Sequence, residues 1–242
     1  MSTVVKLTKK QKTSIKKQEE EQHLAATMQL RKISPATDNQ QTVFKNFYNR
    51  HLFLHGMAGT GKTFIALYLA LKEILNPNSQ YKRIIIVRSL VQTRNMGYLP
   101  GNEKEKSAVY EAPYEDICNE LFEKPGCYKL LKDRGMIHFS STSFIRGLTF
   151  NDAIIIADEI QNYNFEEASS VFTRVGENSK LIACGDAKQN DLYRSQYDQS
   201  GINKVMEVAQ HMKQFCFVEF GPDDIVRSEF CKAWILACYD IG

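Results

Sequence analysis

The feature that most constrains this chain is the segment 56–63, which reads GMAGTGKT. It fits the pattern GxxxxGK[ST] and lies between a short apolar run and a long apolar segment typical of a helix. Glycines let the backbone curl and turn its N–H groups toward an anion, and the following helix presents the positive end of its dipole there. Such a string arises by chance in roughly one chain per hundred of this length. The segment therefore predicts a phosphate-binding loop.

The loop assigns roles to individual side chains. We expect Lys62 to reach the β- and γ-phosphates of a nucleoside triphosphate, and Thr63 to offer its hydroxyl to Mg²⁺. ATP and Mg²⁺ are thus the expected ligands. The residues expected to contact the nucleotide in this segment are Gly56, Met57, Ala58, Gly59, Thr60, Gly61, Lys62, Thr63 and Phe64.

A pair of acidic residues follows the apolar run 153–157. Asp158 comes at the carboxyl end of this predicted strand, the edge at which parallel sheets bind ligands, and is the expected metal ligand. Glu159 is the expected general base for the attacking water. Behind a phosphate-binding loop, this pair favours hydrolysis over a GTPase switch or a small-molecule kinase, although a solvated acid pair at a strand end remains an alternative.

A third polar segment, Gly185-Asp186-Ala-Lys-Gln189, follows the apolar run 180–184. We expect this strand to lie next to the strands at 51–56 and 153–158. Gln189 would then contact the γ-phosphate or the attacking water, with Asp186 in support. A plain polar turn is an equal alternative.

Continuous apolar runs alternate with helical patterns along the chain. Such runs are typical of strands buried on both faces, which predicts an α/β fold: a three-layer P-loop NTPase domain with a mainly parallel sheet. The expected strands are 51–56, 83–87, 136–139, 153–158 and 180–185, with the run FCFVEF at 215–220 after them. The expected helices are about 38–48, 64–75, 114–122, 128–133, 165–175, 201–210 and 225–240, whereas 89–112 reads as a loop.

The charge is uneven along the chain. The formal net charge is +3, yet residues 1–34 alone carry eight Lys and Arg side chains against three Glu, a net +5. We expect a basic extension over 1–34, helical or disordered, and one ATPase domain over 35–242. The extension could be an arm for nucleic acid or ring assembly, or a solvated tail, and the acidic run Glu19–Glu21 favours the tail.

The remaining composition is that of an ordinary cytoplasmic protein. No apolar run approaches the ~20 residues of a membrane helix, and the N-terminus lacks the apolar core of a signal peptide. The six cysteines form no CxxC pair and have no zinc-like spacing with histidine, so we expect reduced thiols.

Together these segments resemble the PhoH-like ATPase family, whose core is similar to the helicase/RecA type of P-loop domain. The resemblance spans about residues 35–230. Besides the loop and its helix, it includes the segments KRIIIVRSLVQTRNMGYLPGNEKEK, SFIRGLTFNDAIIIADEIQN and FTRVGENSKLIACGDAKQNDL. The chain departs from the family in having Ser89 after Arg88, and Ile160 inside its acidic motif.

The resemblance implies further roles. Gln40 is the position that would recognise the adenine edge, with Gln41 as a second candidate. Arg88 lies where relatives contact nucleic acid or a phosphate. The stretch DIVR at 224–227 implies Arg227 as an arginine finger, which stabilises charge on the transferring phosphoryl group. Rival candidates for the finger are Arg146 and Arg174.

Two functional interpretations follow. The first is an ATPase that remodels RNA or single-stranded DNA, acting as a ring oligomer, a hexamer by analogy with the family, in which a neighbour's arginine completes each site. Bases could stack on Tyr98, Tyr110 or Tyr114, although such rings more often cap a core. The second is a nucleotide-dependent regulatory switch, or an ATPase acting on a protein partner, without translocation.

Overall fold

One parallel sheet organises the molecule. The computed structural model describes residues 28–90, 103–186 and 201–241, and within them six strands lie in the order β3-β2-β4-β5-β1-β6, each parallel to its neighbours. The strands are β1 (His51–Gly56), β2 (Arg83–Arg88), β3 (Ile137–Ser141), β4 (Ala153–Asp158), β5 (Lys180–Gly185) and β6 (Phe215–Phe220). The order places β5 between β1 and β4, as predicted, and the expected α/β fold is confirmed.

Both faces of the sheet are buried, which explains the continuous apolar runs. In β2 and β4, Ile84, Ile86, Ile154 and Ile156 join one core cluster, and the residues between them join a second cluster on the opposite face. Since successive side chains of a strand alternate between faces, both sets of positions must be apolar.

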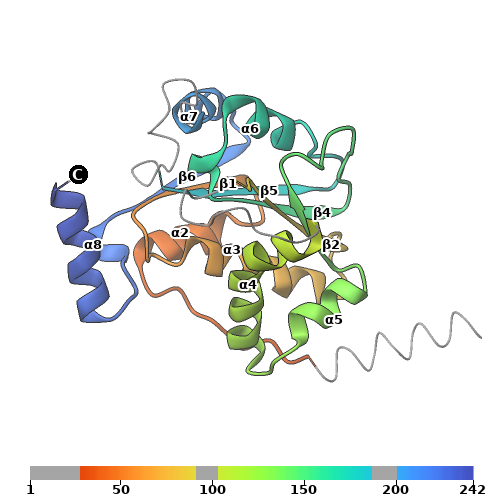
Figure 1. The fold of residues 1–242 in the computed structure, drawn as a ribbon, viewed down its shortest axis with the longest axis horizontal. Coiled ribbons are helices and arrows are strands. Elements are labelled where there is room, and N and C mark those ends of the chain that lie inside the picture. The colour runs from red at the N-terminus through yellow and green to blue at the C-terminus, as the bar shows by residue number, and fades with distance from the viewer. Residues whose placement is uncertain (1–27, 91–102, 187–200, 242) are drawn as a thin grey trace, which may run out of the picture.

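Helices form the two outer layers (Figure 1). The helices on one face are α2 (Asp38–Asn46), α3 (Lys62–Ile74), α4 (Glu103–Phe122) and α5 (Cys127–Asp133), and those on the other are α6 (Phe165–Phe172) and α7 (Ile202–Gln210). The last helix, α8 (Glu229–Ile241), stands apart from both layers at one end of the molecule. Two short 3-10 helices, η1 (Ile160–Asn162) and η2 (Pro222–Asp224), follow β4 and β6.

Three sequence predictions need correction. The segment 103–112 is helical, because α4 begins at Glu103 rather than near 114. The C-terminal helix begins at Glu229 rather than 225, after an extended residue at Ile225. The helix expected over 165–175 ends at Phe172. Residues 91–102 of the predicted loop lie outside the described residues.

The described end of the predicted N-terminal extension packs against the domain. Met28 is buried, the Arg31 N–H donates to the Leu121 carbonyl at 2.8 Å, and the Ile33 N–H donates to the Tyr68 hydroxyl at 3.2 Å. Among the described residues, no helix combines the length and apolar character needed to cross a membrane.

Candidate nucleotide-binding site

The loop between β1 and α3 has the backbone that its glycines predict. Gly56, Gly59 and Gly61 have φ angles of 107°, 73° and 79°, which side chains rarely allow. A Cβ at Gly56 would lie 2.2 Å from the Phe220 carbonyl oxygen, so β6 also excludes a side chain there. The loop leads directly into α3, which begins at Lys62, and the first residues of this helix line the cavity. A helix N-terminus is a favourable place for an anion.

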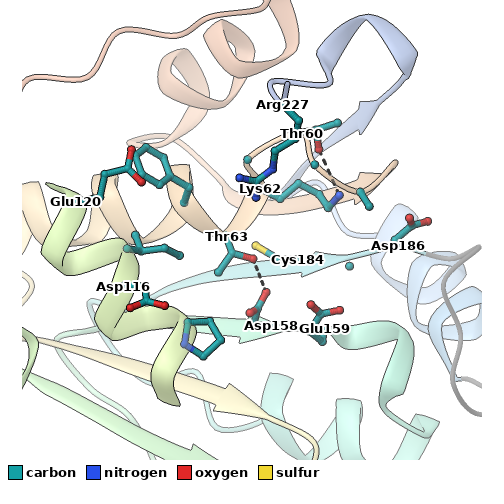
Figure 2. A pocket seen from close by; sticks show the side chains of 17 residues that line it. Thr60, Lys62, Thr63, Asp116, Glu120, Asp158, Glu159, Cys184, Asp186 and Arg227 are labelled. Atoms are coloured by element: carbon teal, nitrogen blue, oxygen red, sulfur yellow. Dashed lines mark hydrogen bonds between the residues drawn. The ribbon is translucent and has the colours of Figure 1, made fainter. Parts of the chain in front are cut away.

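Lys62 folds back onto its own loop. Its ammonium donates to the carbonyls of Gly56 and Met57 at 2.8 and 2.6 Å, and lies 3.3 Å from the Thr60 hydroxyl (Figure 2). Burial lowers the pKa of Lys62, while Asp186 is the strongest of the groups that oppose this shift. Phosphate oxygens would offer this ammonium the negative charge that the carbonyls lack.

Thr63 and Asp158 meet across the cavity. The Thr63 hydroxyl donates to Asp158 Oδ1 at 2.7 Å (Figure 2), and the Tyr114 hydroxyl donates to Asp158 Oδ2 at 2.8 Å. Tyr114 is only 1% exposed, so it cannot stack on a base, and its position beside the metal-ligand candidate was not predicted. Nothing in the sequence signalled this contact, because α4 carries no motif.

Glu159 lies at the same edge of the sheet, one residue past the end of β4. Its backbone is left-handed, with a φ of 53°, a conformation that costs a non-glycine residue energy and is often found at functional sites. Burial, followed by the charge of Asp158, raises the pKa of Glu159, and Arg88, Gln161 and Lys62 oppose this shift. A raised pKa suits a carboxylate that must accept a proton near neutral pH.

Arg88 lies beside these carboxylates rather than in solvent. Its guanidinium stacks over the Tyr110 ring at 5.7 Å. Burial disfavours its charge, but Tyr114, Asp158 and Glu159 outweigh that effect and raise the pKa of Arg88. The Tyr110 ring thus already has a partner in Arg88, and the stacking of bases on it stays a prediction. Tyr98 lies outside the described residues.

The cavity formed by these groups has a volume of about 500 Å³. One wall comes from α4, a contribution that sequence reasoning missed (Figure 2). The lining residues are Ala58, Gly59, Thr60, Gly61, Lys62, Thr63, Phe64, Pro113, Asp116, Ile117, Glu120, Asp158, Glu159, Cys184, Gly185, Asp186 and Arg227.

Some predicted nucleotide contacts do not line this cavity. Gly56 and Met57 lie behind it and hold Lys62. Gln40 is buried, and its carboxamide accepts from the Ala36 N–H at 2.7 Å and donates to the Thr60 carbonyl at 3.2 Å. Its role in adenine recognition stays a prediction, and Gln189 lies outside the described residues.

The three arginine candidates have different surroundings. Arg227 lines the cavity of its own chain and lies near Lys62 in Figure 2. Arg174 donates to the Leu148 carbonyl at 3.3 Å, an interaction that ties two loops together. Arg146 is exposed, next to the buried Ile145. The structure therefore brings Arg227, but not its rivals, to the predicted nucleotide site.

The residues present fit a magnesium ion and a triphosphate. Mg²⁺ takes oxygen ligands, usually one or two from protein with the rest from phosphates and water, and Thr63 and Asp158 supply such a pair. In the part of the chain that the structure describes, no group of three or more His, Cys, Asp or Glu side chains is arranged to hold a metal alone. Phosphate oxygens and water would supply the remaining ligands of an Mg²⁺ ion held by Thr63 and Asp158.

Comparisons with solved structures concern the fold alone. The large terminase of a thermophilic bacteriophage aligns with 81% of this chain and 48% of its own, with a TM-score of 0.50 and 11% identity. The Hef helicase domain of Pyrococcus furiosus aligns with 77% of this chain and 39% of its own, with a TM-score of 0.44 and 14% identity. The arrangement is that of a P-loop NTPase domain.

Sequence comparisons give the family. The chain is 33% identical to a PhoH-like protein of Synechocystis over 87% of its length and 65% of that protein. It is 33% identical to Protein PhoH of Escherichia coli over 75% of its length and 51% of that protein, so it spans between about half and two thirds of these relatives. The family model for PhoH-like proteins matches residues 32–240, and the chain therefore belongs to the PhoH-like protein family.

Proposed function

We propose that this chain is a Mg²⁺-dependent ATPase that hydrolyses ATP to ADP and phosphate. The observation that carries the proposal is the convergence of Lys62, Thr63, Asp158 and Glu159 on one cavity. A phosphate-binding loop, a metal-ligand pair and a carboxylate with a raised pKa are the parts that hydrolysis of a phosphoanhydride requires.

Each residue has a distinct task in this proposal. Lys62 leaves the carbonyls of its loop to contact the β- and γ-phosphates. Thr63 and Asp158 hold Mg²⁺, which when bound neutralises charge on those phosphates. Glu159 accepts the proton of the attacking water. Arg227 stabilises charge on the transferring phosphoryl group, and Gln189 contacts the γ-phosphate or the water.

The test is phosphate release from ATP, with Mg²⁺ and with EDTA, together with ATP affinity. Lys62→Ala should weaken ATP binding about 10- to 100-fold, because it removes a charge-assisted contact. Lys72→Ala, on the exposed side of the same helix, is the matched control and should bind as the wild type does. Equal affinity in both variants, or release that persists in EDTA, would overturn the proposal.

We further propose that hydrolysis is coupled to remodelling of RNA or single-stranded DNA. Support comes from the loop after β3, where the Thr142 N–H donates to the Arg88 carbonyl at 3.2 Å. Phe144 is 58% exposed on this loop and Arg146 is exposed beside it, which offers a ring for stacking and a cation for the backbone.

This coupling predicts that single-stranded RNA or DNA raises the rate of phosphate release, and that the rise shrinks at high salt. Phe144→Ala should reduce the stimulation without changing the basal rate. If nucleic acid leaves the rate of phosphate release unchanged, the result would instead favour a regulatory switch or a protein-directed ATPase.

We also propose a ring homo-oligomer, a hexamer by analogy with the family. Support comes from α8, whose outward residues Phe230, Trp234 and Ile241 are 79%, 65% and 89% exposed. Its inward residues Ile235 and Leu236 are apolar as well. Large apolar side chains gathered on one exposed helix face are typical of a contact surface, so a second copy of the chain is the proposed partner of the outer face.

A further inference from the structure

A buried glutamine connects the proposed base to the neighbouring strand. Gln161 lies on η1, two residues after Glu159, and is 2% exposed. Its Nε2 donates to the Glu159 carboxylate, and its Oε1 accepts from the Asp186 N–H at 3.0 Å. Both ends of this carboxamide are therefore engaged inside the protein, next to the nucleotide cavity.

The orientation of the carboxamide is fixed by its partners. The Asp186 N–H can only donate, so it needs the amide oxygen of Gln161. This leaves the NH₂ group facing Glu159, and a carboxyl oxygen of Glu159 accepts its hydrogen bond. A flipped amide would set two donors against each other at Asp186.

The end of β5 is shaped around the same side chain. A Cβ at Gly185 would lie 2.8 Å from Gln161 Oε1 and 2.6 Å from the Cγ1 atom of Ile160, so only glycine leaves this space. At the other end, Glu159 has the left-handed backbone noted above. Two independent features of the chain thus accommodate one buried amide.

We infer that Gln161 is the positioning residue that aims the Glu159 carboxylate during hydrolysis. It touches neither substrate nor metal and acts through Glu159. The inference rests on the proposed ATPase function, in which Glu159 is the base.

Two substitutions separate positioning from a merely structural role. Gln161→Met preserves volume and loses both hydrogen bonds. Gln161→Glu retains an oxygen for the Asp186 N–H but turns a second acceptor toward Glu159. If Gln161 only supported the strand, Gln161→Glu would reduce kcat less than Gln161→Met does. If Gln161 positions Glu159, Gln161→Glu should reduce kcat more than Gln161→Met does.

The measurements are kcat and ATP affinity. We expect kcat to fall about 10- to 100-fold with ATP affinity unchanged, as for the loss of a hydrogen bond to a charged group. The fall should be larger in Gln161→Glu, which turns a second acceptor toward Glu159. Should Gln161→Glu not fold, Gln161→Met decides. A wild-type kcat in Gln161→Met would overturn the inference, and so would a kcat that falls only together with ATP affinity.

Failure of the inference is distinguishable from failure of the proposed function. If Glu159→Gln hydrolyses ATP normally, the base assignment itself is wrong. If Glu159→Gln is inactive while both Gln161 variants match the wild type, only the positioning role is wrong. Independently of activity, the NMR signal of the Gln161 side-chain NH₂ should differ between the wild type and Glu159→Gln, because the group that accepts its hydrogen bond is changed. The same signal in both proteins would also overturn the inference.

Discussion

At the scale of single residues, the contacts of Asp158 show how the protein holds a candidate metal ligand. Thr63 holds one carboxylate oxygen and the buried Tyr114 holds the other. We predict that Tyr114→Phe lowers the free energy of unfolding by about 1–3 kcal/mol, because a buried carboxylate oxygen loses its donor. Since only Thr63 would then hold the Asp158 carboxylate, the Mg²⁺ concentration for half-maximal hydrolysis should also rise.

The chain offers a matched control for this prediction. The Tyr128 hydroxyl donates to the Glu111 carboxylate at 2.9 Å, between α5 and α4 and outside the cavity. Tyr128→Phe should therefore lower stability without changing the Mg²⁺ dependence. An unchanged Mg²⁺ requirement in Tyr114→Phe would show that Tyr114 does not orient Asp158.

Lys180 predicts a pH dependence of stability. Its ammonium donates to the Arg50 carbonyl and lies 5.0 Å from the Phe47 ring, and burial lowers its pKa to about 8. In the unfolded chain, a lysine has a pKa of about 10.4. Between the folded and the unfolded pKa of Lys180, the unfolded chain therefore binds more protons than the folded one. The burial penalty is thus fully present below about pH 8 and fades as the pH rises toward 10.4.

The measurement is urea unfolding of the wild type and of Lys180→Met from pH 7 to pH 10. Relative to the variant, the wild type should gain stability as the pH rises above about 8. A constant difference across this range would mean that Lys180 titrates alike in both states.

At the scale of elements, the sequence predicts the buried strands well, because their apolar pattern is local. It does not predict the start of α4 or where this helix packs, because tertiary contacts determine both. The bounds of β1, β4 and β5 agree with the predicted ranges, because a short, mainly apolar run that ends in Gly or Asp is typical of a buried strand of a parallel sheet. The start of α4 was read as a loop, since EKEKSAVYEA has no apolar stripe and Pro113 follows it. Tyr114 and most α4 residues of the cavity wall lie in the helix predicted over 114–122, but a helical pattern does not show where in the fold a helix packs.

Helix α8 carries the prediction that belongs to this scale. Trp234→Ser should shift the protein to smaller species in size-exclusion chromatography with light scattering, because it removes the largest apolar side chain from the proposed interface. Val208→Ser, on the outer side of α7 and 50% exposed, is the control and should leave the mass unchanged. Equal masses for all three proteins would contradict the role of α8 in assembly.

At the scale of the whole molecule, the parallel sheet gathers the site. The phosphate-binding loop follows β1, the acidic pair ends β4, and Asp186 follows β5, all at the carboxyl edge of three adjacent strands. Helix α8 reaches the same edge, since Tyr239 donates to the Asp186 carboxylate and Ile235 lies against Gly59. A partner that binds α8 would therefore contact an element that touches the cavity residues Asp186 and Gly59. In the proposed ring, this contact would link neighbouring sites.

The central claim is that this cavity hydrolyses ATP with Glu159 as the base. The most direct measurement is single-turnover phosphate release from ATP and Mg²⁺ by the wild type and Glu159→Gln, alongside ATP affinity. We predict that the variant binds ATP as the wild type does and releases phosphate about 10²- to 10⁴-fold more slowly, the range for loss of a general base. Release at the wild-type rate would contradict the account.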